Sequence, residues 1–218
     1  KVYNIREVDE LILLDVNATS ENRNQVYHEI EELTSQSFVP LTIGGGINNL
    51  DQIRSLLQSG ADKVCINTTA YYKPEIIKMA SETFGSQCIV ISVDVQKRKN
   101  GYIECYSHSG SKPTGREVSK HCKEMESLGA GEILITSITH DGMMKGYDLE
   151  LITLISKSVS IPVIASGGAG NYKHMYSAIK SGADSVAAAS MFHYTEQTPL
   201  KAKQYLQMNG IPIRNLNS

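Results

Sequence analysis

The sequence predicts one α/β domain over residues 1–218, a (β/α)8 (TIM) barrel of two duplicated half-barrels whose first strand and following loop are missing. Short β-branched runs alternate with amphipathic stretches along the whole chain, which is the order of a strand–helix repeat. Most runs are apolar on both faces, as in a parallel sheet covered by helices. The two halves of the chain also repeat each other.

The predicted strands are seven runs of about six residues. They begin at residue 11 (LILLDV), 39 (VPLTIGG), 62 (DKVCIN), 88 (CIVISVD), 132 (EILITS), 161 (IPVIASGG) and 184 (DSVAAAS). Residues 50–60 and 74–85 are the clearest helices between them, because both close with Gly and the second opens with Pro. This order predicts right-handed crossovers between parallel strands.

The repeat keeps one fixed offset. VPLTIGGG from 39 matches IPVIASGG from 161, SGADKV from 59 matches SGADSV from 181, and DELIL from 9 matches GEILI from 131, always 122 residues apart. A constant offset indicates two half-barrels built from one ancestral unit. An open doubly wound sheet is the alternative.

The same offset places the partner of the strand at 88 upstream of Lys1. A closed barrel has eight strands, and seven are predicted here. We therefore expect the first strand and its loop to lie upstream of Lys1. A native seven-stranded open barrel would expose strand edges and is disfavoured.

Composition excludes several classes of function. The chain has 21 Lys and Arg against 23 Asp and Glu, so no bulk field attracts nucleic acid or anionic membrane. Its apolar runs are strand-sized, far short of the roughly 20 residues of a membrane-spanning helix. The four cysteines show no metal-ligand spacing, which predicts a reducing cytoplasm and no structural zinc. Nothing else in the sequence calls for a metal or an organic cofactor.

Two glycine-rich turns predict phosphate binding. Barrel enzymes place their chemistry at the C-terminal ends of strands, where glycine N–H groups and the next helix converge on an anion. A lone glycine run is usually only a turn, but two copies at one offset predict two phosphate sites and a ligand with a phosphate at both ends. The predicted residues are Gly44, Gly45, Gly46, Asn67 and Thr68 in one half, and Ser166, Gly167, Gly168, Gly170 and Ser190 in the other.

Carboxylates at the same strand ends are candidate acids and bases. Asp94 closes CIVISVD and is the predicted catalytic residue, since a carboxylate in the barrel mouth can transfer protons. Asp15 directly follows the apolar run at 11–14, and it is either a substrate-binding group or a helix cap. Asp141 and Gly142 follow another strand and form either an acid beside the substrate or a simple turn. His193 is interpreted as structural or peripheral.

The ordered motifs LLDVNAT, PLTIGGGI, GADKVCINT, FGSQCIVISVD, PTG, GAGEILITS, DGMMKGYD, PVIASGGAG and GADSVAAASMFH resemble the cyclase subunit of imidazole glycerol phosphate synthase over nearly the whole chain. The resemblance implies a histidine-biosynthesis reaction. Ammonia attacks a bis-phosphorylated ribulosyl formimino carboxamide ribotide, which yields imidazole glycerol phosphate and aminoimidazole carboxamide ribotide. It also implies two catalytic aspartates, one matching Asp94 and one on the first strand.

The resemblance further implies a glutaminase partner that docks on the N-terminal face and delivers ammonia through a ring of charges. Glu10, Lys63 and Glu132 match three ring positions, and Gln87 matches a residue of the docking face. Charges at the starts of strands can also be simply solvated.

One motif departs from the family. Where the family usually reads SIDRDG, this chain reads SITHDG, so Thr139 replaces an acidic residue, and Met143 stands where a small polar residue is common. This favours a second interpretation, a paralogue that works with a glutaminase in sugar amidation for surface polysaccharides. A non-catalytic sugar-phosphate binder is a third, against which Asp94 argues.

Overall fold

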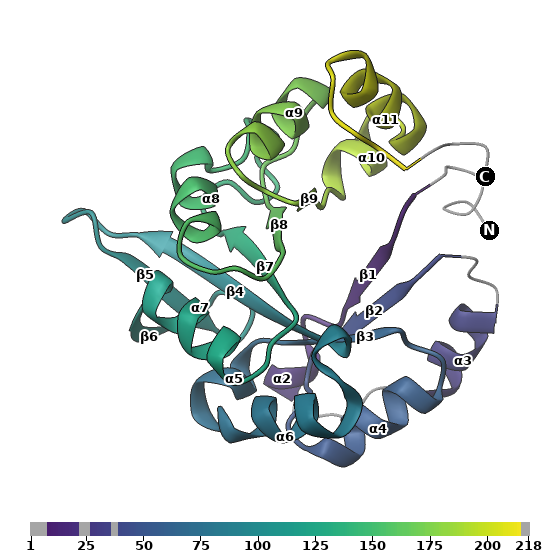
Figure 1. Ribbon diagram of the computed structural model, residues 1–218, viewed down its shortest axis with the longest axis vertical. Coiled ribbons are helices and arrows are strands. Elements are labelled where there is room, and N and C mark those ends of the chain that lie inside the picture. Colours follow the sequence, from purple (N-terminus) through teal and green to yellow (C-terminus); the bar gives the residue numbers. More distant parts are fainter. Residues whose placement is uncertain (1–7, 22–26, 36–38, 215–218) are drawn as a thin grey trace.

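The structure is a computed structural model and describes residues 8–21, 27–35 and 39–214. Its seven parallel strands form one curled sheet, with β1 and β9 at the edges within the described residues (Figure 1). Each strand overlaps one predicted run, so the barrel-type α/β class is confirmed. In spatial order they are β1 (Leu11–Leu14), β2 (Leu41–Gly44), β3 (Lys63–Ile66), β4 (Ile89–Lys97), β7 (Glu132–Ser137), β8 (Val163–Ser166) and β9 (Ser185–Val186).

Helices follow the strands and cover the outer face of the sheet (Figure 1). Both helices foreseen from the sequence form, and each ends at a glycine with positive φ, Gly60 or Gly85. In the described part of the chain, no helix is long and apolar enough to cross a membrane. The helices are α2 (Ala18–Glu21), α3 (Tyr27–Ser35), α4 (Leu50–Gln58), α5 (Thr68–Tyr72), α6 (Glu75–Phe84), η1 (Ser86–Cys88), α7 (Val118–Ser127), α8 (Leu149–Ser156), α9 (Tyr172–Lys180), α10 (Ser190–Tyr194) and α11 (Pro199–Met208).

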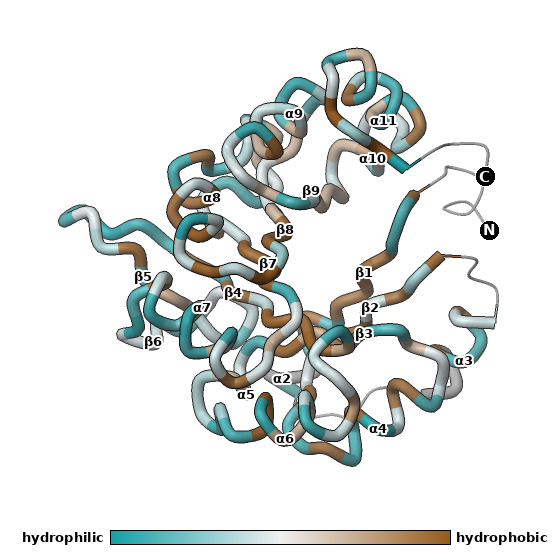
Figure 2. The backbone as a smooth tube through the Cα atoms, viewed as in Figure 1, coloured by the Kyte–Doolittle hydropathy of each residue, from teal (hydrophilic) through white to brown (hydrophobic). Residues whose placement is uncertain are grey.

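Alternate residues of each strand pack into two different cores. Outward residues such as Ile43, Ile91 and Ile133 join the helices in the main core. Inward residues form a smaller cluster of Cys65, Val90, Leu134 and Ile164. The strands β3, β7 and β8 are largely buried on both faces and are mostly hydrophobic, as the brown segments of Figure 2 show.

The repeat extends to individual hydrogen bonds. Asn49 and Asn171, 122 residues apart, cap α4 and α9, their side chains accepting from the third helical N–H at 2.9 and 3.0 Å. Asp62 and Asp184 accept from the first N–H of β2 and β8, both at 2.8 Å. The same side-chain hydrogen bonds therefore recur at equivalent positions in the two half-barrels, which confirms the duplication.

An antiparallel hairpin, β5 (Ile103–Ser107) and β6 (Lys112–Glu117), was not predicted from the sequence. The predicted strand at 88 closes at Asp94, and no further strand is predicted before the run at 132. Asn100-Gly101 and Ser109-Gly110, which flank an alternating run, are hairpin signals that identify it. Pairing with β5 prolongs β4 to Lys97, so Asp94 lies inside its strand rather than at the strand's end.

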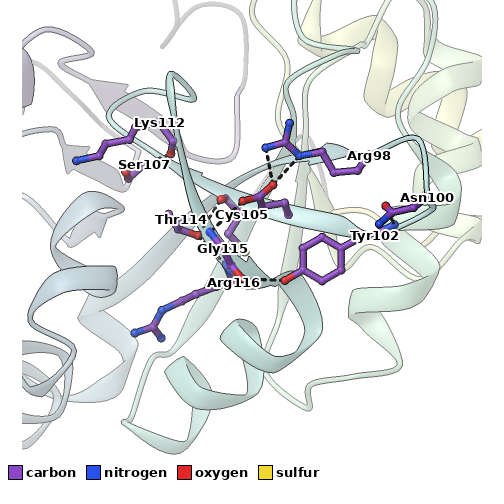
Figure 3. Close-up of polar contacts among 10 residues, drawn as sticks. Arg98, Asn100, Tyr102, Cys105, Ser107, Lys112, Thr114, Gly115 and Arg116 are labelled. Atoms are coloured by element: carbon purple, nitrogen blue, oxygen red, sulfur yellow. Dashed lines mark hydrogen bonds and ion pairs between the residues drawn. The ribbon is translucent and has the colours of Figure 1, made fainter.

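A buried carboxylate holds the hairpin together. Glu104 accepts from the Arg98 side chain at 2.6 Å and from the Gly115 N–H at 2.9 Å. The Tyr102 hydroxyl donates to the Gly115 carbonyl at 2.9 Å (Figure 3). These contacts fall where the β5–β6 register shifts between Glu104 and Tyr106, so they satisfy backbone groups that the irregular ladder leaves unpaired.

Candidate functional site

Asp94 points inward, at the C-terminal half of β4. It lies in register with Thr136 of β7, which lies in register with Ser166 of β8, so the three side chains share one face of the sheet. The Asn67 amide donates to Asp94 Oδ2 at 3.2 Å and to the Ser92 carbonyl at 3.1 Å. The Asn67 amide thus orients the carboxylate, and the binding of phosphate by Asn67 stays a prediction.

Burial, and to a smaller degree the carboxylate of Asp141, raises the pKa of Asp94 to about 6. A carboxyl with such a pKa is mostly ionised at neutral pH yet accepts a proton far more readily than an ordinary aspartate. Carboxyls whose pKa is shifted by burial and by a neighbouring charge are typical of catalytic sites. Asp94 therefore has the electrostatics that proton transfer requires.

The loop after β7 carries a cluster of hydroxyls and one imidazole. The Ser137 hydroxyl lies 2.9 Å from His140 Nδ1, and the Thr139 hydroxyl lies 3.3 Å from the same nitrogen. The N–H groups of His140 and Asp141 both donate to the Ser137 carbonyl at 3.0 Å. This turn places Asp141 close enough to Asp94 for their charges to interact.

The first glycine turn follows β2 and lies against the end of β1. Gly45 has φ +101°, and a Cβ there would lie 2.2 Å from the Asp15 carbonyl oxygen, so only glycine fits. The Asp15 carboxylate accepts from the N–H groups of Asn17 and Ala18, both at 3.1 Å, and caps the start of α2. Of the two roles left open for Asp15, the structure supports the cap, and substrate binding stays a prediction.

The second glycine turn follows β8 and lies against the loop after β7. Gly168 has φ +106°, and a Cβ there would lie 2.1 Å from the Gly146 carbonyl oxygen. The Gly168 carbonyl accepts from the Gly146 N–H at 2.8 Å. Since β2 and β8 are parallel members of one sheet, the two glycine turns lie at the same edge as Asp94.

Thr68 and Ser190, the two hydroxyl residues predicted beside the glycine turns, begin the equivalent short helices α5 and α10. The Thr68 hydroxyl accepts from the His108 N–H at 3.0 Å. Thr68 is thus already held by the β5–β6 hairpin, whereas no hydrogen bond of the Ser190 hydroxyl is found within the described residues.

The turn of the hairpin contacts the segments that follow three barrel strands, a position that no motif predicted. The Ser109 hydroxyl donates to the Val16 carbonyl after β1 at 2.7 Å, and His108 contacts Thr68 after β3. A Cβ on Gly110 would lie 3.2 Å from the Ile138 side chain after β7. Residues 107–111 therefore cover part of the mouth that contains Asp94.

A charged cluster lies inside the opposite, N-terminal edge of the sheet. Lys63 Nζ lies 2.9 Å from Glu10 Oε2 and 2.7 Å from Glu132 Oε1. Burial works to lower the pKa of Lys63, but hydrogen bonds to Glu132 and Glu10 outweigh it and the pKa is raised. The structure thus joins three residues predicted to form the ring. Gln87 is exposed in η1, just before β4 begins at the same edge.

Replacing Lys63 by methionine is expected to lower the free energy of unfolding by about 2 kcal/mol. The change leaves Glu10 and Glu132 facing each other, and Glu132 Oε2 is buried without a partner among the described residues. Urea denaturation measures the effect, and Glu132→Gln in the same chain should restore part of the loss. Lys78→Met removes an exposed 3.9 Å pair and should change stability by less than about 0.5 kcal/mol; equal losses at the two lysines would contradict the prediction.

A comparison with protein families matches residues 1–198 of the chain to the family described as "Histidine biosynthesis protein". The match spans the charged cluster, both glycine turns and Asp94, and ends just before α11.

Proposed function

This chain belongs to the histidine biosynthesis protein family, whose members are barrel enzymes of that pathway, and we propose that it is the cyclase subunit of an imidazole glycerol phosphate synthase. In this proposal it uses ammonia to convert a bis-phosphorylated ribulosyl formimino carboxamide ribotide into imidazole glycerol phosphate and aminoimidazole carboxamide ribotide. The resemblance of its ordered motifs to that subunit extends over nearly the whole chain.

The observation that carries the proposal is the position of Asp94 between two duplicated glycine turns at one edge of the sheet. The turns at 44–46 and 167–170 would each hold one phosphate, with Thr68, Ser166 and Ser190 as further donors. A substrate held at both ends presents its middle to Asp94. Such positioning lowers a reaction barrier by as much as about 7–11 kcal/mol.

In the proposed mechanism Asp94 is the base. It is mostly ionised at neutral pH because its pKa is about 6, and the Asn67 amide fixes its orientation. The second aspartate that the resemblance implies belongs to the first strand of the barrel and would act as the acid. Asp141, whose carboxylate already raises the pKa of Asp94, is proposed to contact the substrate together with Gly142.

A glutaminase subunit is the proposed source of ammonia. The cluster of Glu10, Lys63 and Glu132 lies at the N-terminal edge of the strands, opposite to Asp94, and Gln87 is exposed at that edge. Ammonia released there would reach Asp94 along the inner face of the sheet. Co-purification of the full-length protein with a glutaminase, weakened by Gln87→Glu, tests the partner independently of the chemistry.

Turnover of the bis-phosphorylated ribotide with ammonium salts tests the function directly. A cyclase converts this substrate without its partner, because ammonia in solution replaces the channelled supply. Formation of both products supports the proposal. Binding of the ribotide without any turnover by the full-length protein would overturn it.

The second candidate is an ammonia-supplying subunit for sugar amidation in surface-polysaccharide biosynthesis. It is favoured by Thr139, whose hydroxyl bonds to His140 at a position where the cyclase family usually carries a carboxylate. This candidate predicts no turnover with ammonium salts. Thr139→Asp then provides a sharper comparison: in a cyclase it should preserve or increase ammonium-dependent turnover, and in the second candidate it should have no effect.

A further inference from the structure

Tyr106 of the hairpin lies opposite Asp94. Strand β3 ends at Ile66, and from Asp94 onward β5 takes its place beside β4. Asp94 and Tyr106 are partners in this antiparallel ladder, so their side chains stand on the same face of the sheet, with Cβ atoms about 4.5–5.5 Å apart. Tyr106 therefore extends the inward row of Asp94, Thr136 and Ser166 across the mouth.

The Tyr106 ring is buried, but not in a hydrophobic core. Its exposed fraction is 6%, yet it joins none of the three clusters that buried apolar side chains form in the described part of the chain. The preceding residue, Cys105, points to the opposite face and packs in the main core with the helices. Because Cys105 fixes β5 in this orientation, Tyr106 is turned toward the polar groups of the mouth.

A fixed guanidinium covers the face of the ring. The Arg98 guanidinium carbon lies 5.4 Å from the centroid of the Tyr106 ring, within the range of a cation–π contact. Arg98 is itself held, because its Nε donates to the buried Glu104 carboxylate at 2.6 Å. The ring therefore has a defined orientation beside Asp94.

The Tyr106 hydroxyl is neither paired nor enclosed. Buried tyrosines usually bond their hydroxyl to the protein, as Tyr147 does by donating to the Ala187 carbonyl at 2.9 Å. No hydrogen bond of the Tyr106 hydroxyl is found within the described residues. Its oxygen is also not one of the enclosed polar atoms that lack a partner, so it reaches solvent. A donor on the Asp94 face of the sheet is thus available to a ligand.

We propose that Tyr106 is a further substrate-contacting residue, whose hydroxyl donates a hydrogen bond to the ribulosyl carbonyl oxygen during the addition of ammonia. The inference rests on the proposed function, because it concerns that substrate. The lone pair of ammonia forms the new C–N bond, and the π pair of the C=O bond moves to oxygen, which becomes an alkoxide. Asp94 takes a proton from the new ammonium nitrogen, and Tyr106 keeps its own proton.

This hydrogen bond contributes more in the transition state than in the bound substrate. A carbonyl oxygen is a neutral acceptor, whereas a developing alkoxide accepts a charge-assisted bond, which is roughly twice as strong. An interaction that strengthens along the reaction raises kcat, and one that is equal throughout changes only KM. Loss of the hydroxyl should therefore be visible mainly in kcat.

Tyr106→Phe tests the inference in the full-length protein with ammonium salts. The variant keeps the ring and its contact with Arg98 and loses only the hydroxyl. We expect kcat to fall about a hundredfold, with the KM for the ribotide changed less than about threefold. The midpoint of urea denaturation should stay the same, because the hydroxyl has no partner in the described part of the protein. A purely structural role would lower that midpoint and leave kcat in place.

Tyr102→Phe is the matched control from the same hairpin. The Tyr102 hydroxyl already donates to the Gly115 carbonyl at 2.9 Å. Its removal should lower the midpoint of urea denaturation and change kcat less than about twofold. Equal losses of kcat in the two variants would assign the effect to the hairpin as a whole and overturn the inference.

Tyrosine-ring NMR provides a second measurement that needs no turnover, since the ribotide can bind but cannot react without ammonia. The ring signal that disappears in Tyr106→Phe belongs to Tyr106 and should shift as ribotide is added, while the Tyr102 signal stays in place. An unshifted Tyr106 signal at saturation, or full turnover by Tyr106→Phe, would overturn this inference alone. No turnover by the unsubstituted protein would remove the proposed function and this inference with it.

Discussion

Replacement of Asp94 by asparagine is expected to abolish turnover while making the protein more stable. The asparagine side chain keeps the size of aspartate and can still accept from the Asn67 amide, but it cannot take up a proton. We expect turnover to fall about a thousandfold or more, with sulfate or substrate binding nearly unchanged. Single-turnover assays with ammonium salts and a binding titration measure the two effects separately.

The gain in stability follows from the pKa of Asp94. Burial raises that pKa to about 6 from a usual value of 3.8, so the ionised form is penalised in the folded protein. Above pH 7 the neutral asparagine should add about 2–3 kcal/mol to the free energy of unfolding. The gain should shrink as the pH falls from about 6 towards 3.8 and vanish well below 3.8, where aspartate is protonated in both the folded and the unfolded chain.

The pH dependence of turnover gives a further check on the same residue. If Asp94 accepts the proton, the turnover rate of the unsubstituted protein should fall as the pH drops below about 6, because the carboxylate becomes protonated. Retained activity in Asp94→Asn would remove Asp94 from the mechanism. Lost activity together with lost stability would instead indicate a structural role.

Gly168→Ala is expected to lower the free energy of unfolding by about 3 kcal/mol and to eliminate anion binding at the second glycine turn. Gly168 has φ +106°, and the added Cβ would lie 2.1 Å from the Gly146 carbonyl oxygen. That oxygen is a backbone atom, so it cannot rotate away. The turn must open to relieve the clash, which separates its N–H groups. Urea denaturation and sulfate titration measure the two losses.

Gly101→Ala is the matched control for this substitution. Gly101, in the turn between β4 and β5, also has positive φ, at +84°, but a Cβ there meets nothing within 4 Å. Backbone strain alone should cost about 1 kcal/mol and leave sulfate binding in place. If both variants lose the same stability, the close approach of Gly146 to Gly168 is not what requires glycine in this turn.

Several features of the site were predictable because they depend on local order in the chain. The glycine turns follow their strands directly, and the 122-residue offset between them needed no coordinates. Other features depend on which strands are neighbours. Asn67 reaches Asp94 only because β3 lies beside β4, and Lys63 meets Glu10 and Glu132 only because the sheet curls.

The hairpin between β5 and β6 was missed for a different reason. Its strands are short and partly polar, so the apolar runs that identified the barrel strands were weaker there. Its stability comes instead from the Glu104 carboxylate, which accepts from the Arg98 side chain and from the Gly115 N–H. Arg98 precedes Glu104 in the chain, and Gly115 follows it. Hydrophobic patterning does not detect a polar contact of this kind.

The sequence by itself determined the order of strands and helices, the duplication and the two glycine turns, and it marked Asp94 as the candidate catalytic residue, because each depends on local composition or on a repeat at a fixed offset. Only the tertiary structure decided that Asn67 orients Asp94, that residues 107–111 cover part of the mouth, and that Asp94 carries a raised pKa. The pKa of Asp94 depends on its burial, and the position of residues 107–111 depends on contacts between segments far apart in the chain. These properties arise when the sheet curls and brings those segments together.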